Sequence, residues 1–320
     1  MFNSESPFLR GARFALPLIA ALAGLEQAAR YGAMHCYVHQ AGKINLLMQH
    51  RVDPELAIFG ASNGLADLDA PAIEEATGER TFNFSMDGTP FVQYQVLIRE
   101  LAASYPSCRH VVLAETFMTF LGLPALRTPG KYLPYLGSPS VYPVFREIDP
   151  TLALRARYVP FYSFIVADQD YYKASLRGYL TLLGHPPANS ERQGFMPKDA
   201  VWAEPTQAAQ TAAAVADDFS ESEPVVRAFS EAIALLNRSG KQVFVVVTPL
   251  QADCLGAFPR FERHREKLRS LVGTGNVFLD YTHDPLASDK ANFYNCGHLN
   301  ARGAAALSRV FAADFLELSR

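Results

Sequence analysis

Residues 56–63 read Leu-Ala-Ile-Phe-Gly-Ala-Ser-Asn, a short apolar run that stops at a glycine. A continuous apolar run of this length is typical of a strand that is buried on both faces of a parallel sheet. The same pattern is clearest at residues 242–248, Gln-Val-Phe-Val-Val-Val-Thr. Segments with helical spacing lie between such runs, so strands and helices alternate along the chain. This alternation predicts an α/β protein.

The predicted fold class is a three-layer α/β/α sandwich with a mainly parallel, flavodoxin-like sheet. Further strands are expected at residues 80–85, 110–114 and 276–280, and helices at residues 70–77, 91–104, 222–238, 261–272 and 301–318. Ligands of such sheets bind at the carboxyl ends of the strands. The loops that contain Ser62, Gly88 and Thr116 should therefore share one edge of the sheet.

The pattern divides the chain into two parts. Residues 1–42 form a helical lead-in of signal or anchor type, and residues 43–320 form a single α/β domain. Within that domain, residues 121–205 interrupt the alternation with a stretch rich in Pro, Gly and Tyr. We interpret this stretch as an irregular, aromatic-rich insertion, with one helix expected at residues 171–183.

The lead-in has the composition of a compartment signal. Arg10 and Arg13 precede an apolar run at residues 14–25. A positive region followed by such a run is typical of a signal peptide or an anchor, although this run is too short to span a bilayer securely. The alternative is an ordinary helix of the core or surface. We expect a periplasmic, extracytoplasmic protein that is associated with the inner membrane through residues 10–30.

The charge balance argues against several classes of function. The chain has 29 Lys and Arg residues and 32 Asp and Glu residues, which gives a net charge of −3. Nucleic-acid binders, in contrast, usually have a surplus of basic residues. The sequence has no Gly-x-Gly-x-x-Gly or Walker A pattern, which counts against a nucleotide-binding domain. His35 and His39 have a spacing that suits a metal ion, but no third ligand is near. We therefore predict no cofactor, no metal site and no nucleic-acid partner.

The four cysteines, at positions 36, 108, 254 and 296, leave two readings open. None forms a CxxC pair, so they read first as isolated thiols. In an exported protein, however, Cys254 and Cys296 could form a disulfide next to His298, because both fall in loops at the predicted active edge.

Ser62 and His298 are a candidate nucleophile and base. Ser62 follows a buried strand on a glycine-rich turn, and His298 precedes the last helix. A serine hydroxyl needs a base within hydrogen-bonding reach, usually a histidine that a third group holds. It also needs N–H donors where the oxyanion forms, and the Ser62 and Gly88 N–H groups are candidates. Asn63 and Thr116 lie beside these positions and complete the predicted binding residues.

Three segments resemble the SGNH/GDSL hydrolase superfamily, in its branch of bacterial cell-envelope proteins. Residues 60–63, Gly-Ala-Ser-Asn, are similar to the block that carries the nucleophile, which the resemblance places at Ser62. Residues 82–88, Phe-Asn-Phe-Ser-Met-Asp-Gly, resemble the block whose glycine joins the oxyanion hole. Residues 293–304 resemble the last block, Phe-Tyr-Asp-x-x-His-Leu-Asn-x-x-Gly-Ala, which implies His298 as the base. The branch includes alginate O-acetyltransferase-like and D-alanyl-lipoteichoic acid transfer proteins.

This chain departs from the family pattern in three places. Asn295 stands where the last block has its Asp, Ala61 stands where the first block has Asp, and the third block is absent. An amide can hold the imidazole in place but supplies no negative charge, and the corresponding Asp-to-Asn change in a serine triad lowers turnover by about 10⁴. The carboxylates that could substitute are Asp280, Asp284, Asp289 and Glu115.

Two functions follow from the resemblance. The first is a serine esterase or O-acyltransferase that modifies a cell-envelope polysaccharide with an acetyl or similar group through acyl-Ser62, with Asn295 in the third triad position. The second is a non-catalytic protein of the same fold that binds a glycan or a membrane acyltransferase partner in polysaccharide biosynthesis or export. The expected partner is therefore an envelope polysaccharide or an acyl-carrying membrane protein.

Overall fold

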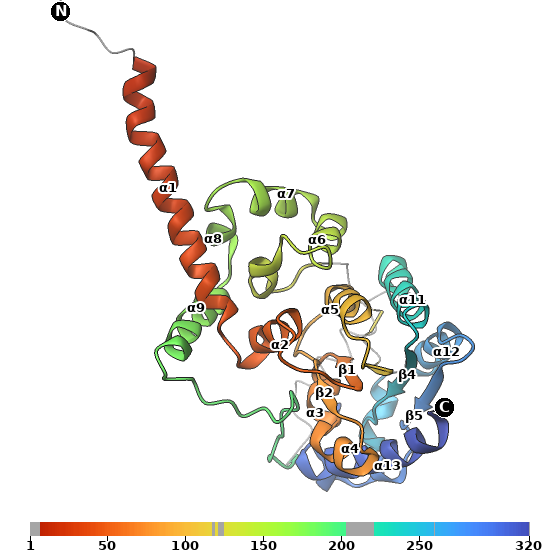
Figure 1. The fold of residues 1–320 in the computed structure, drawn as a ribbon. Coiled ribbons are helices and arrows are strands. Elements are labelled where there is room, and N and C mark those ends of the chain that lie inside the picture. Colours follow the sequence, from red (N-terminus) through yellow and green to blue (C-terminus); the bar gives the residue numbers. More distant parts are fainter. Residues whose placement is uncertain (1–6, 117–118, 121–124, 203–220, 259, 320) are drawn as a thin grey trace, which may run out of the picture. The chain divides into compact units, whose positions relative to one another are not determined.

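The computed structural model describes residues 7–116, 119–120, 125–202, 221–258 and 260–319 (Figure 1). The chain forms two compact units. Unit 1 contains residues 1–45 and 128–188, and unit 2 contains residues 46–127 and 189–320. The lead-in and much of the stretch interpreted as an insertion therefore belong to the same unit.

A five-stranded parallel sheet is the centre of unit 2. Its strands are β1 (Leu56–Gly60), β2 (Thr81–Asn83), β3 (His110–Glu115), β4 (Gln242–Val247) and β5 (Val277–Asp280). Their order is β2-β1-β3-β4-β5, an order of doubly wound sheets. From β1 the chain connects outward to β2 on one side and then crosses to β3 on the other side, so the strand order reverses between β1 and β3. A ligand crevice is expected beyond the carboxyl ends of these two strands.

Helices cover the sheet on both faces (Figure 1). The helices of unit 2 are α3 (Ser62–Asp67), α4 (Ala70–Thr77), α5 (Phe91–Ser104), α11 (Glu223–Arg238), α12 (Phe261–Leu271) and α13 (Ala301–Leu318). On one face, strand residues such as Ile58 and Phe244 form a buried core with Ile73 of α4 and Phe311 of α13. On the other face α5 packs against α11. The predicted α/β class with a parallel sheet is confirmed.

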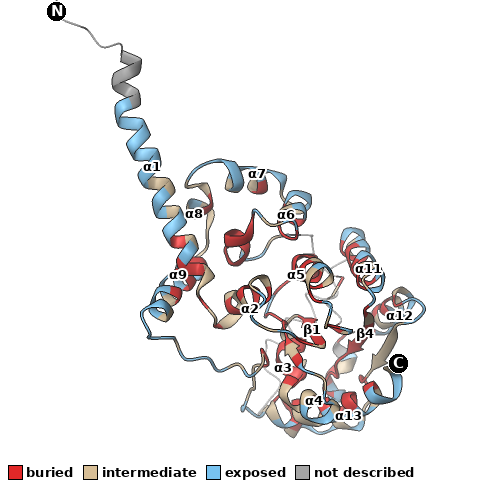
Figure 2. Ribbon diagram, in the orientation of Figure 1, coloured by how far each residue is buried: buried red, intermediate tan, exposed pale blue. Residues whose placement is uncertain are grey.

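Unit 1 is helical. It contains α1 (Pro7–Met34), a 3-10 turn (Pro129–Tyr135), α6 (Tyr142–Ile148), α7 (Pro150–Tyr158), α8 (Tyr162–Val166) and α9 (Gln169–Leu182), while α2 (His39–Met48) crosses the unit boundary. Helices α1 and α9 cross closely, because Gly178 lies directly against the Gly32 carbonyl oxygen and Ser175 donates to the Ala29 carbonyl at 2.8 Å. Figure 2 shows residues 13–21 of α1 as exposed. Among the described helices, none combines the length and the apolarity that crossing a membrane requires.

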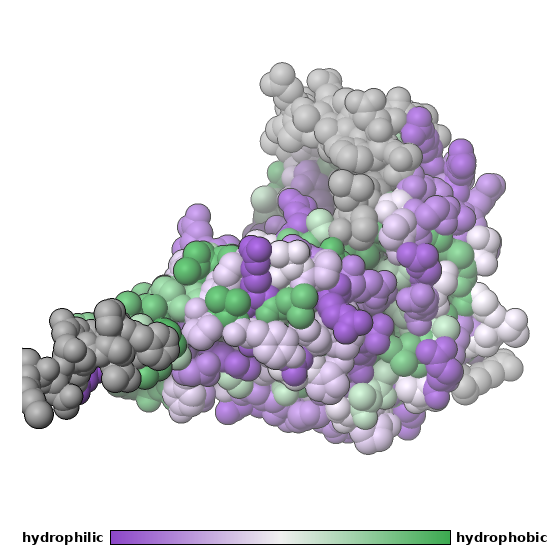
Figure 3. Space-filling view, turned by 90° about the horizontal axis from the view of Figure 1, so that it is seen from above, coloured by the Kyte–Doolittle hydropathy of each residue, from purple (hydrophilic) through white to green (hydrophobic). Residues whose placement is uncertain are grey.

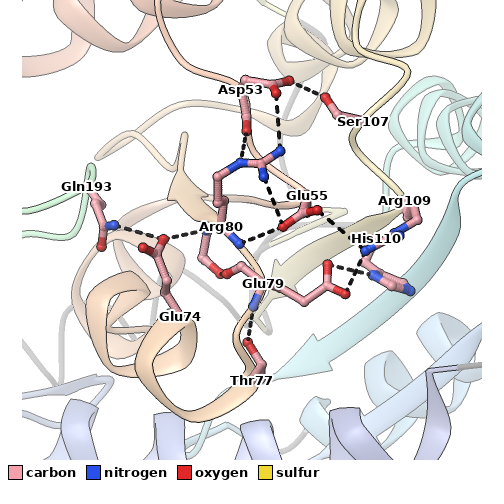
Figure 4. A network of polar contacts seen from close by, with 11 residues as sticks. Asp53, Glu55, Glu74, Thr77, Glu79, Arg80, Ser107, Arg109, His110 and Gln193 are labelled. Carbon is pink, nitrogen blue, oxygen red and sulfur yellow. Dashed lines mark hydrogen bonds and ion pairs between the residues drawn. The ribbon is translucent and has the colours of Figure 1, made fainter.

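A network of ion pairs holds the amino ends of the strands in unit 2 (Figure 4). Arg80 contacts Asp53 at 3.2 Å and Glu55 at 3.5 Å, and Arg109 contacts Glu79 at 3.1 Å. Such half-exposed pairs are each worth at most about 1 kcal/mol. Because they lie at the ends opposite the predicted ligand edge, they contribute to the fold and leave the carboxyl ends free for chemistry.

Candidate active site

Ser62 lies at the first position of α3, directly after the turn that ends β1. Glycine is needed in this turn, because a Cβ atom at Gly60 would lie 2.6 Å from the Ala114 carbonyl oxygen of β3. The Tyr94 hydroxyl of α5 donates to the Gly60 carbonyl oxygen and accepts the Met86 N–H at 2.7 Å. The turn that presents Ser62 is thus held from two sides.

The predicted nucleophile and base are in contact. The Nε2 atom of His298 lies 2.7 Å from Ser62 Oγ, across 236 positions of sequence. The Nδ1 atom of His298 lies 2.9 Å from Oδ1 of Asn295. Both residues belong to a small antiparallel hairpin, β6 (Phe293–Asn295) and β7 (His298–Leu299), which immediately precedes α13. The three residues therefore form the geometric equivalent of a serine triad with an amide in the third position.

A second contact fixes the protonation of this histidine. The Gly297 N–H donates to Oδ1 of Asn295 at 3.0 Å, so the amide presents its oxygen toward the hairpin. An amide oxygen only accepts, so His298 must carry its proton on Nδ1. The Nε2 atom is then an unprotonated acceptor for the Ser62 hydroxyl. The amide at position 295 thus selects the tautomer that a general base requires, and what it lacks is the negative charge.

Burial keeps this imidazole neutral. It lowers the pKa of His298 to about 4, an effect that Asp87 opposes and Lys198 reinforces. The Tyr294 ring stacks on the His298 ring, with 5.4 Å between centroids. At neutral pH the imidazole is therefore unprotonated and can accept a proton, and Asp87 is a carboxylate whose charge favours the imidazolium form.

Asn63 and Asp67 of α3 hold the histidine hairpin in place. The buried side chain of Asn63 donates to the Gly297 carbonyl oxygen at 2.9 Å and to the Thr248 hydroxyl at 3.2 Å. The fully buried Asp67 accepts the Leu299 N–H at 2.8 Å, and burial raises its pKa well above the usual range. The Asn63 amide nitrogen is committed to these two oxygens, so the structure supports a positioning role where the sequence suggested an oxyanion or binding role.

A disulfide between Cys254 and Cys296 adds a covalent restraint beside His298. Of the two readings that the sequence left open, the structure has the bridged one. The Gln251 N–H also donates to the Cys296 carbonyl oxygen at 3.0 Å. The loop after β4 and the histidine hairpin are therefore linked twice, while Cys36 and Cys108 are buried free thiols.

Ser62 opens into a cavity of about 220 Å³ beyond the ends of β1 and β3. Gly88, Asn63 and Thr116 line this cavity, as the sequence predicted for residues of one sheet edge. Gly88 has a φ of +61°, a conformation that glycine adopts without strain. Its carbonyl oxygen accepts from Arg127, which lines the same cavity, at 3.2 Å. The other lining residues include Asp87, Phe91, Glu115, Thr119 and Val225.

The carboxylates considered as substitutes for the missing triad Asp have other partners. Asp280 pairs with Arg265 at 2.9 Å, Asp284 accepts the Leu286 N–H, and Asp289 accepts the Ala291 N–H. Glu115 lies in the cavity wall, where the Thr119 hydroxyl contacts it at 2.6 Å. The substitution hypothesis is therefore wrong in this structure, because Asn295 itself occupies the position at His298 Nδ1.

Sequence reasoning missed the residues that support the site. Tyr94 and Asp67 act through contacts between elements far apart in the chain, and an isolated Tyr or Asp within a helix carries no local signal of such a role. Tyr294 stacks on His298 within one hairpin, a contact that the sequence alone does not reveal. In the described parts of the chain, no group of three His, Cys, Asp or Glu side chains could hold a metal ion.

No protein-family model matches this chain, and the search of curated proteins also gives no match. The site must therefore be interpreted from its own geometry.

Proposed function

We propose that the protein is a serine esterase or O-acyltransferase of the SGNH/GDSL hydrolase type, which acts on a cell-envelope polysaccharide. The observation that carries the proposal is the chain of contacts from Asn295 Oδ1 through His298 to Ser62 Oγ, at 2.9 Å and 2.7 Å. A serine hydroxyl bonded to a neutral, correctly protonated histidine at the ligand edge of a parallel sheet suits nucleophilic acyl transfer.

In the proposed reaction, Ser62 Oγ attacks the carbonyl carbon of the acyl donor while its proton moves to His298 Nε2. Collapse of the tetrahedral intermediate breaks the bond to the leaving oxygen, which takes the proton from Nε2 and leaves acyl-Ser62. Water or a polysaccharide hydroxyl then attacks the acyl-serine and gives its proton to Nε2. Release of the product returns that proton to Ser62 Oγ. The N–H groups of Ser62 and Gly88 are the proposed donors to the oxyanion.

The dimensions of the cavity support a short acyl group. A volume of about 220 Å³ lies below the range of about 300–1,000 Å³ that is usual for drug-sized ligands. An acetyl group fits such a space, whereas a polysaccharide must approach from the solvent side. Phe91 and Val225 offer apolar contacts to the acyl group.

The amide at position 295 favours a second candidate function. Asn295 supplies no negative charge beside His298 Nδ1 to stabilise the imidazolium form, and an Asp-to-Asn change at this place in a serine triad lowers turnover by about 10⁴, there through the wrong tautomer. A chain that kept the geometry but lost the charge would suit a non-catalytic protein that binds a glycan or a membrane acyltransferase partner in polysaccharide biosynthesis or export.

We also propose that the protein is extracytoplasmic and associates with a membrane surface through residues 10–30. The disulfide supports an oxidising compartment. Of the 20 large apolar residues that are exposed among the described ones, 16 lie in unit 1, including Phe14, Leu16 and Leu18 of α1. Figure 3 shows this hydrophobic surface along the N-terminal helix.

Charge supports the same assignment. Unit 1 has ten Lys and Arg against six Asp and Glu, a net charge of +4, whereas unit 2 has 19 against 26, a net charge of −7. Basic residues beside exposed apolar ones favour contact with anionic lipid headgroups.

A fluorophosphonate probe, which reacts with activated serines, separates the two functions. If the protein is an enzyme, the probe should label the folded wild type, and this labelling should disappear in Ser62→Ala and in His298→Ala. The matched control is Ser85→Ala, which removes a buried serine of the neighbouring strand end and should leave labelling intact. Absence of labelling in a folded wild-type protein would leave only the non-catalytic function.

A further inference from the structure

Glu115 is a buried carboxyl group in the wall of the Ser62 cavity. It is the last residue of β3, and its neighbour Ala114 pairs with Gly60, the residue from which the Ser62 turn begins. The residue is only 4% exposed, yet it lines the cavity together with Ser62 and Thr119. The function proposed above assigns it no role.

Burial keeps this carboxyl group in its acid form. It raises the pKa of Glu115 to about 8, and a hydrogen bond with Thr119 opposes this effect only in part. The cation that lines the same cavity, Arg127, is bonded to the Gly88 carbonyl oxygen. Near pH 7 the group is thus mainly a carboxylic acid, which can donate a hydrogen bond, whereas a carboxylate only accepts.

The Glu115–Thr119 contact allows the protons to be counted. The two side chains meet at 2.6 Å between Oε2 and Oγ1, so one proton lies between them. The Thr119 hydroxyl donates in this contact, so with Glu115 as an acid the pair holds two protons, and the carboxyl proton on the other oxygen of Glu115 remains for a further acceptor. With Glu115 ionised the pair holds a single proton, which the contact between them uses. The count requires that Thr119 donates to Glu115 and not to the Thr116 carbonyl oxygen, which lies farther from Thr119 Oγ1, at 2.9 Å.

We propose that the Glu115–Thr119 pair donates a hydrogen bond to the acyl carbonyl oxygen of a ligand in the Ser62 cavity. The pair thereby adds a donor to the Ser62 and Gly88 N–H groups, and it does so only while Glu115 is an acid. This inference rests on the proposed acyl-transfer function. In other enzymes, removing one hydrogen-bond donor to the developing oxyanion lowers kcat by about 10²- to 10³-fold.

The test uses the pH dependence of Ser62 acylation by p-nitrophenyl acetate, corrected for buffer hydrolysis. The wild-type rate should be level up to about pH 7, fall to about half at pH 8 and fall by about 30-fold at pH 9.5, because the rate follows the fraction of Glu115 that stays protonated. Glu115→Gln keeps a donor that does not titrate, so its rate should stay level to pH 9.5. Glu115→Leu should be at least tenfold slower than Glu115→Gln at pH 7.

Glu100→Gln is the matched control, since Glu100 is a buried glutamate of α5 outside the cavity lining. This variant should retain the fall above pH 8. The inference is overturned if Glu115→Gln shows the same alkaline fall as the wild type, or if the wild-type rate stays level to pH 9.5.

A second readout requires no turnover and separates this inference from the proposed function. Acetamide presents a neutral carbonyl oxygen, and its binding can be followed by ligand-observed NMR. Wild type should bind it at least tenfold more weakly at pH 9.5 than at pH 7, and Glu115→Gln should bind it equally at both. If acetamide binding shows this pH dependence but Ser62 is never acylated, the proposed enzymatic function is refuted and the donor pair is supported. Equal pH dependence in wild type and Glu115→Gln would refute the donor pair, whatever the acylation result.

Discussion

Replacing Asn295 by Asp should restore the charge that the site lacks. The oxygen of residue 295 lies 2.9 Å from His298 Nδ1 and already accepts the Gly297 N–H. A carboxylate can accept both hydrogen bonds in the same geometry, and the tautomer of His298 stays the same. The substitution therefore changes the charge beside the ring and little else.

The size of the effect follows from the distance. A carboxylate whose charge lies about 4 Å from that of the imidazolium stabilises it by about 4 kcal/mol at an effective dielectric constant of 20. Each 1.36 kcal/mol is a factor of ten in rate, so the full effect is about 10³-fold. Residue 295 is partly exposed, which weakens the interaction, and we expect Asn295→Asp to accelerate acylation of Ser62 by 10² to 10³.

The assay is the rate of Ser62 acylation by p-nitrophenyl acetate as a function of pH. The added charge should also raise the pKa of His298 above about 4, so the rising acid limb of the profile should move to higher pH. The double variant Ser62→Ala/Asn295→Asp gives the background rate. A folded Asn295→Asp protein with an unchanged rate and an unchanged acid limb would refute the view that the site lacks only charge.

Three further predictions concern the support of the site. The bridge between Cys254 and Cys296 closes a loop of 42 positions, so Cys254→Ser/Cys296→Ser should lower the free energy of unfolding by about 4 kcal/mol in urea titrations, and a reductant should have no further effect on that variant. Because the pKa of Glu115 is about 8 when folded and about 4.5 when unfolded, its contribution to stability is complete below pH 4.5 and is lost as the pH rises through 8. The free energy of unfolding of the wild type, measured in urea titrations, should therefore fall by about 5 kcal/mol relative to that of Glu115→Gln over this pH range. The same pH dependence of the unfolding free energy in both proteins would contradict the buried acid. Asn63→Ala should lower the free energy of unfolding by about 2 kcal/mol and reduce fluorophosphonate labelling at least tenfold, because the histidine hairpin loses its hydrogen bonds to α3. A variant with unchanged stability and full labelling would exclude that role.

The sequence predicts the sheet and the location of the site, because these features depend on local patterns. The apolar runs at residues 56–60 and 242–247 are strands buried on both faces, and the helix expected at residues 301–318 has those bounds. Parallel strands bring their carboxyl ends to one edge whatever the loops contain. This rule places Ser62, whereas His298 lies in a separate antiparallel hairpin, and its pairing with Ser62 across 236 positions is predicted from its place before the last helix and from the family resemblance of residues 293–304.

Features that depend on contacts between distant elements could not be predicted in this way. Nothing in residues 295–298 reveals that the Gly297 N–H turns the Asn295 oxygen toward His298, yet this contact decides the tautomer. The acid form of Glu115 depends on burial behind the Ser62 turn, which only the packed structure defines. The grouping of the lead-in with residues 128–188 likewise arises from packing between helices, including the close crossing of α1 and α9.

The central claim is that Ser62 is a nucleophile that His298 activates. The most direct test is to incubate the protein with p-nitrophenyl acetate, quench it in acid and locate the added acetyl group by peptide mass spectrometry. We predict one acetyl group on Ser62 of the wild type and none at that position in His298→Ala. Acetylation of Ser62 to the same extent in His298→Ala, or a folded wild type with no acetyl group on Ser62, would contradict the claim.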